Sequence, residues 1–216
     1  VLIELIDEPI NSNHKCEIGY YPSLYGVDIR ITSENDKKKE ALSKTLETLL
    51  GQYVFGFDND TMEEVVVRLA IDKNMSISLA ESCTGGLIGH RLTQVPGSSR
   101  VFKGGVVVYS NYAKIKILGV DEQNINNHGA VSEQTSKDMA QKVRSMFSTD
   151  IGLSVTGIAG PDGGNKLKPV GLTYIGLSDS SGQKVRKFNF GSNRINNKSR
   201  VSQSALNWLR LEIANG

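Results

Sequence analysis

Hydroxyl, thiol and glycine residues gather in the segment AESCTGGL, residues 80–87, directly after a short apolar run. Such a junction between a strand and a helix directs free backbone N–H groups and the positive end of the helix dipole at whatever lies above it. Gly85 and Gly86 would let a phosphate or carboxylate approach the backbone closely, and Ser82 and Thr84 could add hydroxyl donors. A structural alternative stays open, in which a hydroxyl caps the helix and the glycines only shape the turn.

A second segment, VPGSSRVFKGGVVVYSNYAK at 95–114, could supply a nucleophile and a base. A serine hydroxyl needs a base to remove its proton, and histidine, the usual partner, is scarce because only three are present. A lysine whose pKa is lowered by burial can serve instead, and a tyrosine hydroxyl can relay a proton, so Lys114 and Tyr109 are candidates. Lys114 could equally be a solvated surface lysine.

A third segment, VTGIAGPDGGNKLKPVG at 155–171, reads as a strand that ends at Thr156 and enters a glycine-rich turn at Gly157. So much glycine indicates backbone close to a ligand or another chain, or a mobile lid, although a long connection without a ligand would look the same. Asp162 is the only carboxylate in this loop, so the paired acids of metal or glycosidic chemistry are missing. No HExxH, Walker A or GxGxxG motif is present, and we expect neither a metal nor a cofactor.

Composition narrows the classes of partner. The chain has 25 Lys and Arg against 23 Asp and Glu, a formal charge of +2, which gives a nucleic-acid partner little support. Its two cysteines form no CxxC motif, so disulfide stapling and thiolate metal sites are not expected. No apolar run approaches the roughly 18 residues that span a bilayer, and the start lacks the pattern of a signal peptide. We therefore expect a cytoplasmic protein without a membrane partner.

The elements that must position these segments alternate between helix and strand after residue 60. Apolar spacing predicts helices over 61–74, 87–95, 133–147 and 200–216. Strands are predicted over 76–82, 104–110, 150–160, 170–178 and 184–190. This alternation predicts a layered α/β/α domain with a mixed sheet, since the last two strands are close enough to form a hairpin.

Residues 1–60 read as a separate small α+β domain. GVDIRIT at 26–32 alternates as a strand does, KKKEALSKTLETLLGQY at 37–53 has helical apolar spacing, and YVFGF at 53–57 is a short strand candidate. The polar run DND at 58–60 supplies the break. Two domains, 1–60 and 61–216, are therefore predicted.

Four motifs in this order, AESCTGG, PGSS followed by YSNYAK, HGAVSE, and SVTGIAGPDGG followed by KPVG, closely resemble the CinA (competence/damage-inducible) family over about residues 61–216. The segment IGYYPSLYGVDIRIT is similar to the small KH-type domain that precedes the amidase domain in full-length members, but it has no GxxG loop of the RNA-binding type. The resemblance implies hydrolysis of the carboxamide of nicotinamide mononucleotide to nicotinic acid mononucleotide and ammonia, in pyridine-nucleotide salvage. It also implies a homodimer or larger assembly.

The resemblance carries site residues with it. It implies Ser99 as nucleophile, Lys114 as base and Tyr109 as an assisting group. The positions that it implies for substrate binding are Ser82, Thr84, Gly85, Gly86, Thr156, Gly157 and Arg194. Arg194 stands in Gly-Ser-Asn-Arg where the family has Gly-Asp-Arg, so Arg200 is the other candidate for binding phosphate.

Rival readings stay open. Ser82 or Thr84 could be the nucleophile of the same pocket, and the chain could instead be a non-catalytic regulator or a competence factor associated with nucleic acid. Full-length relatives also carry an N-terminal domain that resembles molybdopterin-binding proteins and is associated with ADP-ribose pyrophosphatase activity. Nothing here corresponds to that domain, so we expect the chain to be a fragment of a longer protein.

Overall fold

In a computed structural model, which describes Ile6 and residues 16–216, the chain divides into two compact units, 1–57 and 58–216. The sequence analysis expected a boundary after residue 60. Of the helices in the described part of the chain, none is both long and apolar enough to cross a bilayer.

The first unit pairs a hairpin with a helix. Strands β1 (Glu17–Pro22) and β2 (Val27–Thr32) are antiparallel, and α2 (Asp36–Leu50) begins at the Asn35 cap. The apolar face of α2, with Leu42, Leu46 and Leu50 buried, packs against isoleucines of the hairpin. The YVFGF strand prediction is wrong, because residues 51–53 form a single 3₁₀ turn and 54–57 have no regular structure. The KH-type assignment of this unit stays a prediction.

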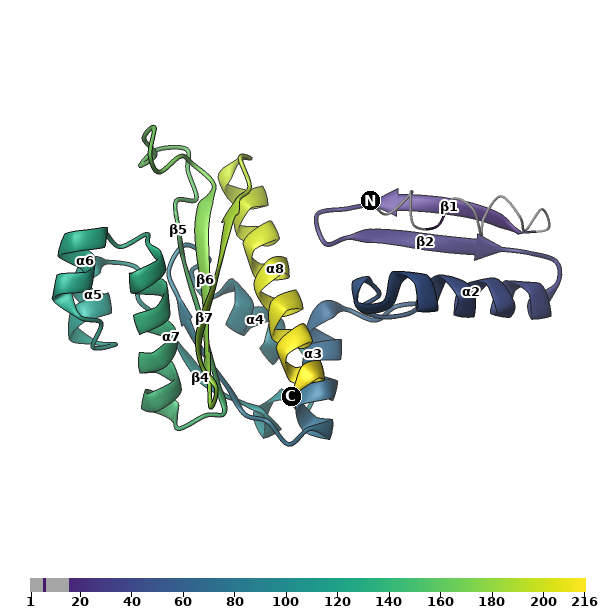
Figure 1. The fold of residues 1–216 in the computed structure, drawn as a ribbon, viewed down its shortest axis with the longest axis horizontal. Coiled ribbons are helices and arrows are strands. Elements are labelled where there is room, and N and C mark those ends of the chain that lie inside the picture. The colour runs from purple at the N-terminus through teal and green to yellow at the C-terminus, as the bar shows by residue number, and fades with distance from the viewer. Residues whose placement is uncertain (1–5, 7–15) are drawn as a thin grey trace. The chain divides into compact units, whose positions relative to one another are not determined.

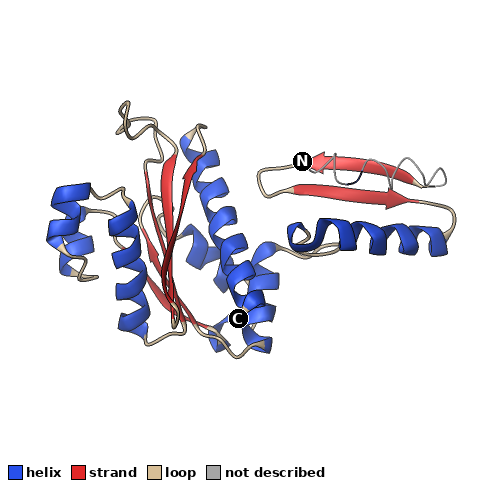
Figure 2. Ribbon diagram, viewed as in Figure 1, coloured by secondary structure: helices blue, strands red, loops and turns tan. Residues whose placement is uncertain are grey.

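The second unit is a mixed α/β domain around one five-stranded sheet (Figures 1 and 2). Its strands run in the spatial order β4-β3-β5-β6-β7 and have the bounds β3 (Ile77–Glu81), β4 (Phe102–Val107), β5 (Ile151–Gly157), β6 (Leu172–Asp179) and β7 (Gly182–Asn189). Strands β3, β4 and β5 are parallel, whereas β6 and β7 are antiparallel additions. The predicted mixed sheet and its terminal hairpin are confirmed.

Helices cover both faces of this sheet (Figure 1). One face carries α5 (Asn111–Lys116), α6 (Glu122–His128) and α7 (Glu133–Phe147), and the other carries α3 (Met62–Asp72), α4 (Leu87–Thr93) and α8 (Arg194–Asn215). The short helices α5 and α6 were not predicted, because segments of six and seven mostly polar residues show no clear period. Apolar side chains of α7, β3 and the α5–α6 region make the core on one side.

The parallel strands give the sheet two distinct edges. At the carboxyl edge, β3, β4 and β5 end at Glu81, Val107 and Gly157. At the amino edge lie the starts of these strands, the 3₁₀ turn η2 (Ser98–Arg100) and the β6–β7 hairpin. Ligands of open α/β sheets bind beyond the carboxyl ends of the strands, so this edge is the first place to look for a site.

Candidate functional site

A tight turn leaves β3 at the carboxyl edge. The Ser82 N–H donates to the Val155 carbonyl of the neighbouring strand at 3.0 Å, and the Gly85 N–H closes the turn on the Ser82 carbonyl at 3.0 Å. Gly85 and Gly86 have φ values of 62° and 92°, which side chains other than glycine rarely adopt. These two glycines therefore allow the chain to reverse into α4 while Ser82 stays at the edge of the sheet.

The buried carboxylate of Glu81 holds this turn from below. It accepts the N–H groups of Gly86 at 3.0 Å, Ile88 at 3.2 Å and Gly89 at 2.8 Å, which are the free donors at the start of α4. The sequence analysis expected those donors to face a bound anion. In this structure the Gly86 N–H donates to a carboxylate of the protein itself, and a role of Gly86 in substrate binding stays a prediction.

Lys114, from α5, is the side chain that approaches Ser82. Its Nζ lies 3.1 Å from Ser82 Oγ and donates to the Val108 carbonyl at 2.9 Å, and the side chain is 2% exposed. Burial lowers the pKa of Lys114, because the charged form loses its hydration and no described carboxylate compensates it. An amine in its neutral form has a lone pair for the serine proton, which is the requirement for a serine and lysine pair.

The expected pairing of Ser99 with Lys114 does not occur. Ser99 is an exposed residue of η2, which immediately precedes β4 and lies at the amino edge. Lys114 is reached after β4 ends, at the carboxyl edge. Because a strand advances about 3.3 Å per residue, the six residues of β4 separate the two side chains by a distance on the order of 15 Å or more.

Tyr109 and Arg194 meet at the rim of the site. The Arg194 guanidinium donates to the Tyr109 hydroxyl at 2.6 Å and to the Gly160 carbonyl at 2.8 Å. Arg194 thereby ties the start of α8 to the loop after β5 and to the segment after β4. The structure thus brings these two predicted residues together at the carboxyl edge.

Three further positions predicted to bind substrate are Thr156, Gly157 and Thr84. They differ in whether their groups already contact other parts of the protein. Thr156 donates its hydroxyl to the Ala130 carbonyl at 2.7 Å, and a Cβ on Gly157 would lie 2.6 Å from Thr173 Oγ1 and 3.1 Å from Cys83 Sγ. Both positions therefore serve the packing of the loop in this structure. The hydroxyl of Thr84 is different, since it is buried and has no hydrogen-bond partner among the described residues.

The thiol beside the serine is not in its reactive form. Cys83 is 6% exposed, and burial raises its pKa to about 12. A thiol rather than a thiolate therefore lies in this turn at neutral pH, and thiols are poor nucleophiles.

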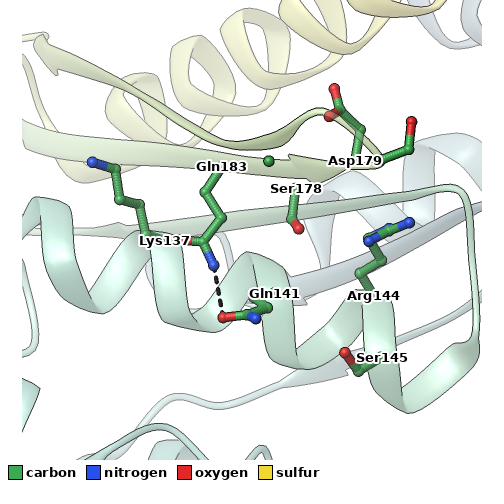
Figure 3. Close-up of a pocket in the computed structure, with 9 residues that line it drawn as sticks. Lys137, Gln141, Arg144, Ser145, Ser178, Asp179 and Gln183 are labelled. Carbon is green, nitrogen blue, oxygen red and sulfur yellow. Dashed lines mark hydrogen bonds between the residues drawn. The ribbon is translucent and has the colours of Figure 1, made fainter.

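A surface hollow of about 420 Å³ lies away from this turn, between α7 and the β6–β7 hairpin at the amino edge (Figure 3). The charged side chains that line it already have protein partners. Lys137 pairs with Glu133, Arg144 donates to a backbone carbonyl, and Asp179 accepts from Ser181. Because its charged side chains are paired, the hollow does not compete with the turn at 82–86 as a candidate site.

Comparison with known proteins identifies the second unit. The CinA C-terminal domain model matches residues 59–213. A competence-damage inducible protein of Caldicellulosiruptor bescii is 45% identical over 97% of this chain, and one of Clostridium kluyveri is 42% identical over 98%. This chain spans 53% of the length of each of these two relatives.

Solved structures agree with this assignment. The competence/damage inducible protein of Agrobacterium tumefaciens has a TM-score of 0.67 and 34% identity, with 74% of this chain and 99% of that chain covered. A CinA superfamily protein of Klebsiella pneumoniae has a TM-score of 0.69 and 25% identity, with 72% of this chain and 97% of that chain covered. On the match of the family model and these similarities, the chain belongs to the CinA family.

Proposed function

We propose that this chain hydrolyses the carboxamide of nicotinamide mononucleotide, with Ser82 as nucleophile and Lys114 as its base. The observation that carries the proposal is the 3.1 Å contact between Lys114 Nζ and Ser82 Oγ in a buried site. The substrate is taken from the resemblance to the CinA family, whereas the pair of residues is taken from the geometry.

The first half of the reaction forms an ester on Ser82. Neutral Lys114 accepts the hydroxyl proton as Oγ bonds to the carboxamide carbon, and the carbonyl π electrons move to oxygen. Collapse of this tetrahedral intermediate breaks the C–N bond, and the leaving nitrogen takes the proton from the Lys114 ammonium and departs as ammonia. A nicotinoyl ester remains on the serine.

The second half uses water in place of the serine hydroxyl. Lys114 accepts a proton as the water oxygen bonds to the ester carbon, and the new intermediate expels Ser82 Oγ, which regains a proton from Lys114. The product acid loses its remaining proton to solvent and leaves as the carboxylate of nicotinic acid mononucleotide. The hydrogen bond from Lys114 to the Val108 carbonyl keeps the amine in place through both halves.

The turn itself offers donors for the oxyanion. In the described part of the chain, the backbone N–H groups of Cys83 and Thr84 face the Cys83 sulfur, which is a weak acceptor, and donate to no backbone carbonyl. The residue after a nucleophilic serine commonly supplies such a donor, and a lost donor typically costs about 10²- to 10³-fold in rate. The unsatisfied hydroxyl of Thr84 could add a third.

Tyr109 has a supporting place in this scheme. Its oxygen accepts from Arg194, so its own proton is free to point toward the leaving nitrogen or the ring of the substrate. We propose that it assists departure of ammonia. The homo-oligomeric state that the family resemblance implies, and the cytoplasmic location expected from the composition, belong to the same proposal.

Release of ammonia from nicotinamide mononucleotide, measured with a chelator present, tests the proposal. We expect turnover by the chain and no effect of the chelator. If no ammonia is released at any of the pH values tested from 6 to 10, the proposal is contradicted. Salt-sensitive DNA binding without ammonia release would favour the reading as a nucleic-acid-associated module instead.

A further inference from the structure

Lys198 is a cation beside the turn at 82–86, and no described residue pairs with it. It lies in the second turn of α8, is partly buried, and places its Nζ 3.7 Å from the position that a Cβ on Gly85 would take. Within the described residues, its ammonium forms no hydrogen bond and no ion pair. What distinguishes Lys198 is its place beside the backbone of the turn, where an ammonium without a carboxylate of its own attracts an anion.

The neighbouring cations have other tasks. Arg194, one helical turn before Lys198 and on the same face of α8, already bonds the Gly160 carbonyl and the Tyr109 hydroxyl. Arg200 is exposed, and two residues of helix rotate it about 200° away from Lys198, so it faces away from the turn. Of the two arginines considered from the sequence, neither is as free to bind an anion at the turn as Lys198.

The backbone donors at the start of α4 are not available to a phosphate. The carboxylate of Glu81 occupies the donors at the start of α4, and it would also repel a phosphate placed there. The approach that remains is from the side of Gly85, where the absence of a Cβ leaves room beside the Lys198 ammonium.

We propose that Lys198 binds the phosphate of the mononucleotide and so makes the site prefer nucleotides to nucleosides. This inference rests on the proposed function for the identity of the substrate. Ser82 and Gly85 are the ends of one four-residue turn, so the Lys198 ammonium lies within about 10 Å of the Ser82 residue. A separation of this order suits a ligand with its amide at one end and its phosphate at the other.

The test measures binding separately from turnover. Calorimetry with nicotinic acid mononucleotide, which has no amide to hydrolyse, and with its riboside, which has no phosphate, is carried out on the parent chain, Lys198→Met and Lys198→Arg. We expect the parent to prefer the mononucleotide by about 10- to 100-fold, Lys198→Met to lose that preference and bind the riboside unchanged, and Lys198→Arg to keep most of it.

Lys142→Met is the matched control, because Lys142 is also a partly buried lysine without a described partner but lies on α7, across the sheet. We expect it to bind both ligands as the parent does. Unchanged preference in Lys198→Met, or a parent that does not distinguish the two ligands, would overturn the inference. A preference that depends on Lys198 in a chain that releases no ammonia would keep the inference and reject the amidase.

Discussion

At the carboxyl edge of the sheet, the Thr84 hydroxyl and the Lys198 ammonium have no partner among the described residues, whereas the charged side chains that line the amino-edge hollow are paired. The first edge also holds Lys114, a buried lysine that contacts a serine hydroxyl and a backbone carbonyl. The second holds the hollow in which Lys137, Arg144 and Asp179 all have partners. Unsatisfied polar groups are costly to fold, so their concentration at one edge indicates where a ligand completes the structure.

The largest expected effect belongs to the base. Lys114→Met removes the amine and keeps the length of the side chain, so we expect ammonia release to fall by about 10³-fold or more with the fold intact. Lys116→Met is the control, because Lys116 is exposed on the same helix. Circular dichroism checks the fold of both variants, and turnover by Lys114→Met above a tenth of the parent rate would contradict the role.

The pH dependence of the parent should follow the same group. The pKa of Lys114 is lowered from 10.5 in the folded chain by burial, so the active neutral amine is lost as pH falls through that lowered pKa. We expect kcat/KM to rise with pH through this range.

The free energy of unfolding should rise with pH over the window from the lowered pKa to 10.5, because there the unfolded chain binds the extra proton. Denaturant titrations across pH measure this, and Lys114→Met should remove this part of the slope. An equal slope in that variant would assign the effect to another group.

A smaller loss of activity is expected from a change at Glu81, which holds the turn in place but takes no part in the reaction. Glu81→Gln leaves an amide NH₂ facing backbone N–H donors, so we expect a loss of about 1–3 kcal/mol in the free energy of unfolding. Displacement of Ser82 should lower kcat by about 10-fold or more. Urea titration and ammonia release measure the two effects, and a variant equal to the parent in both would show that the carboxylate does not position the turn.

The smallest effects should lie at the amino edge. Ser99→Ala and Gln183→Ala change exposed residues, one in η2 and one that donates to Gln141 beside the hollow. We expect ammonia release within about twofold of the parent and stability within about 0.5 kcal/mol, as for most surface changes. A large loss of activity in either variant would remove the distinction between the two edges.

The sequence predicted the helices and strands of the fold better than it predicted which serine pairs with Lys114. Helix 133–147 was predicted with the bounds that the structure has, because its apolar residues recur at helical spacing. The strands that flank the site were placed to within a few residues for a similar reason. Local periodicity is enough to predict such elements, because a helix or strand is formed by residues that are close in sequence.

The pairing of Lys114 depends on which edge of the sheet each segment reaches. PGSS and YSNYAK lie close in sequence but at opposite ends of β4, whereas Ser82 and Lys114 are brought together by the parallel pairing of β3 with β4. The cap formed by Glu81 was also missed, although an acid at a strand end followed by Gly-Gly and a helix is a signal that could have indicated it. Chain order alone does not give the pairing of Ser82 with Lys114.

Covalent labelling tests the central assignment most directly, because the two candidate serines fall in different tryptic peptides, 74–91 and 92–100. The parent chain is treated with a serine-reactive fluorophosphonate, digested and mapped by mass spectrometry. We predict the adduct on the peptide 74–91, at Ser82, and its loss in Lys114→Met. An adduct on the peptide 92–100, or labelling of Ser82 that is equally fast without Lys114, would contradict the account.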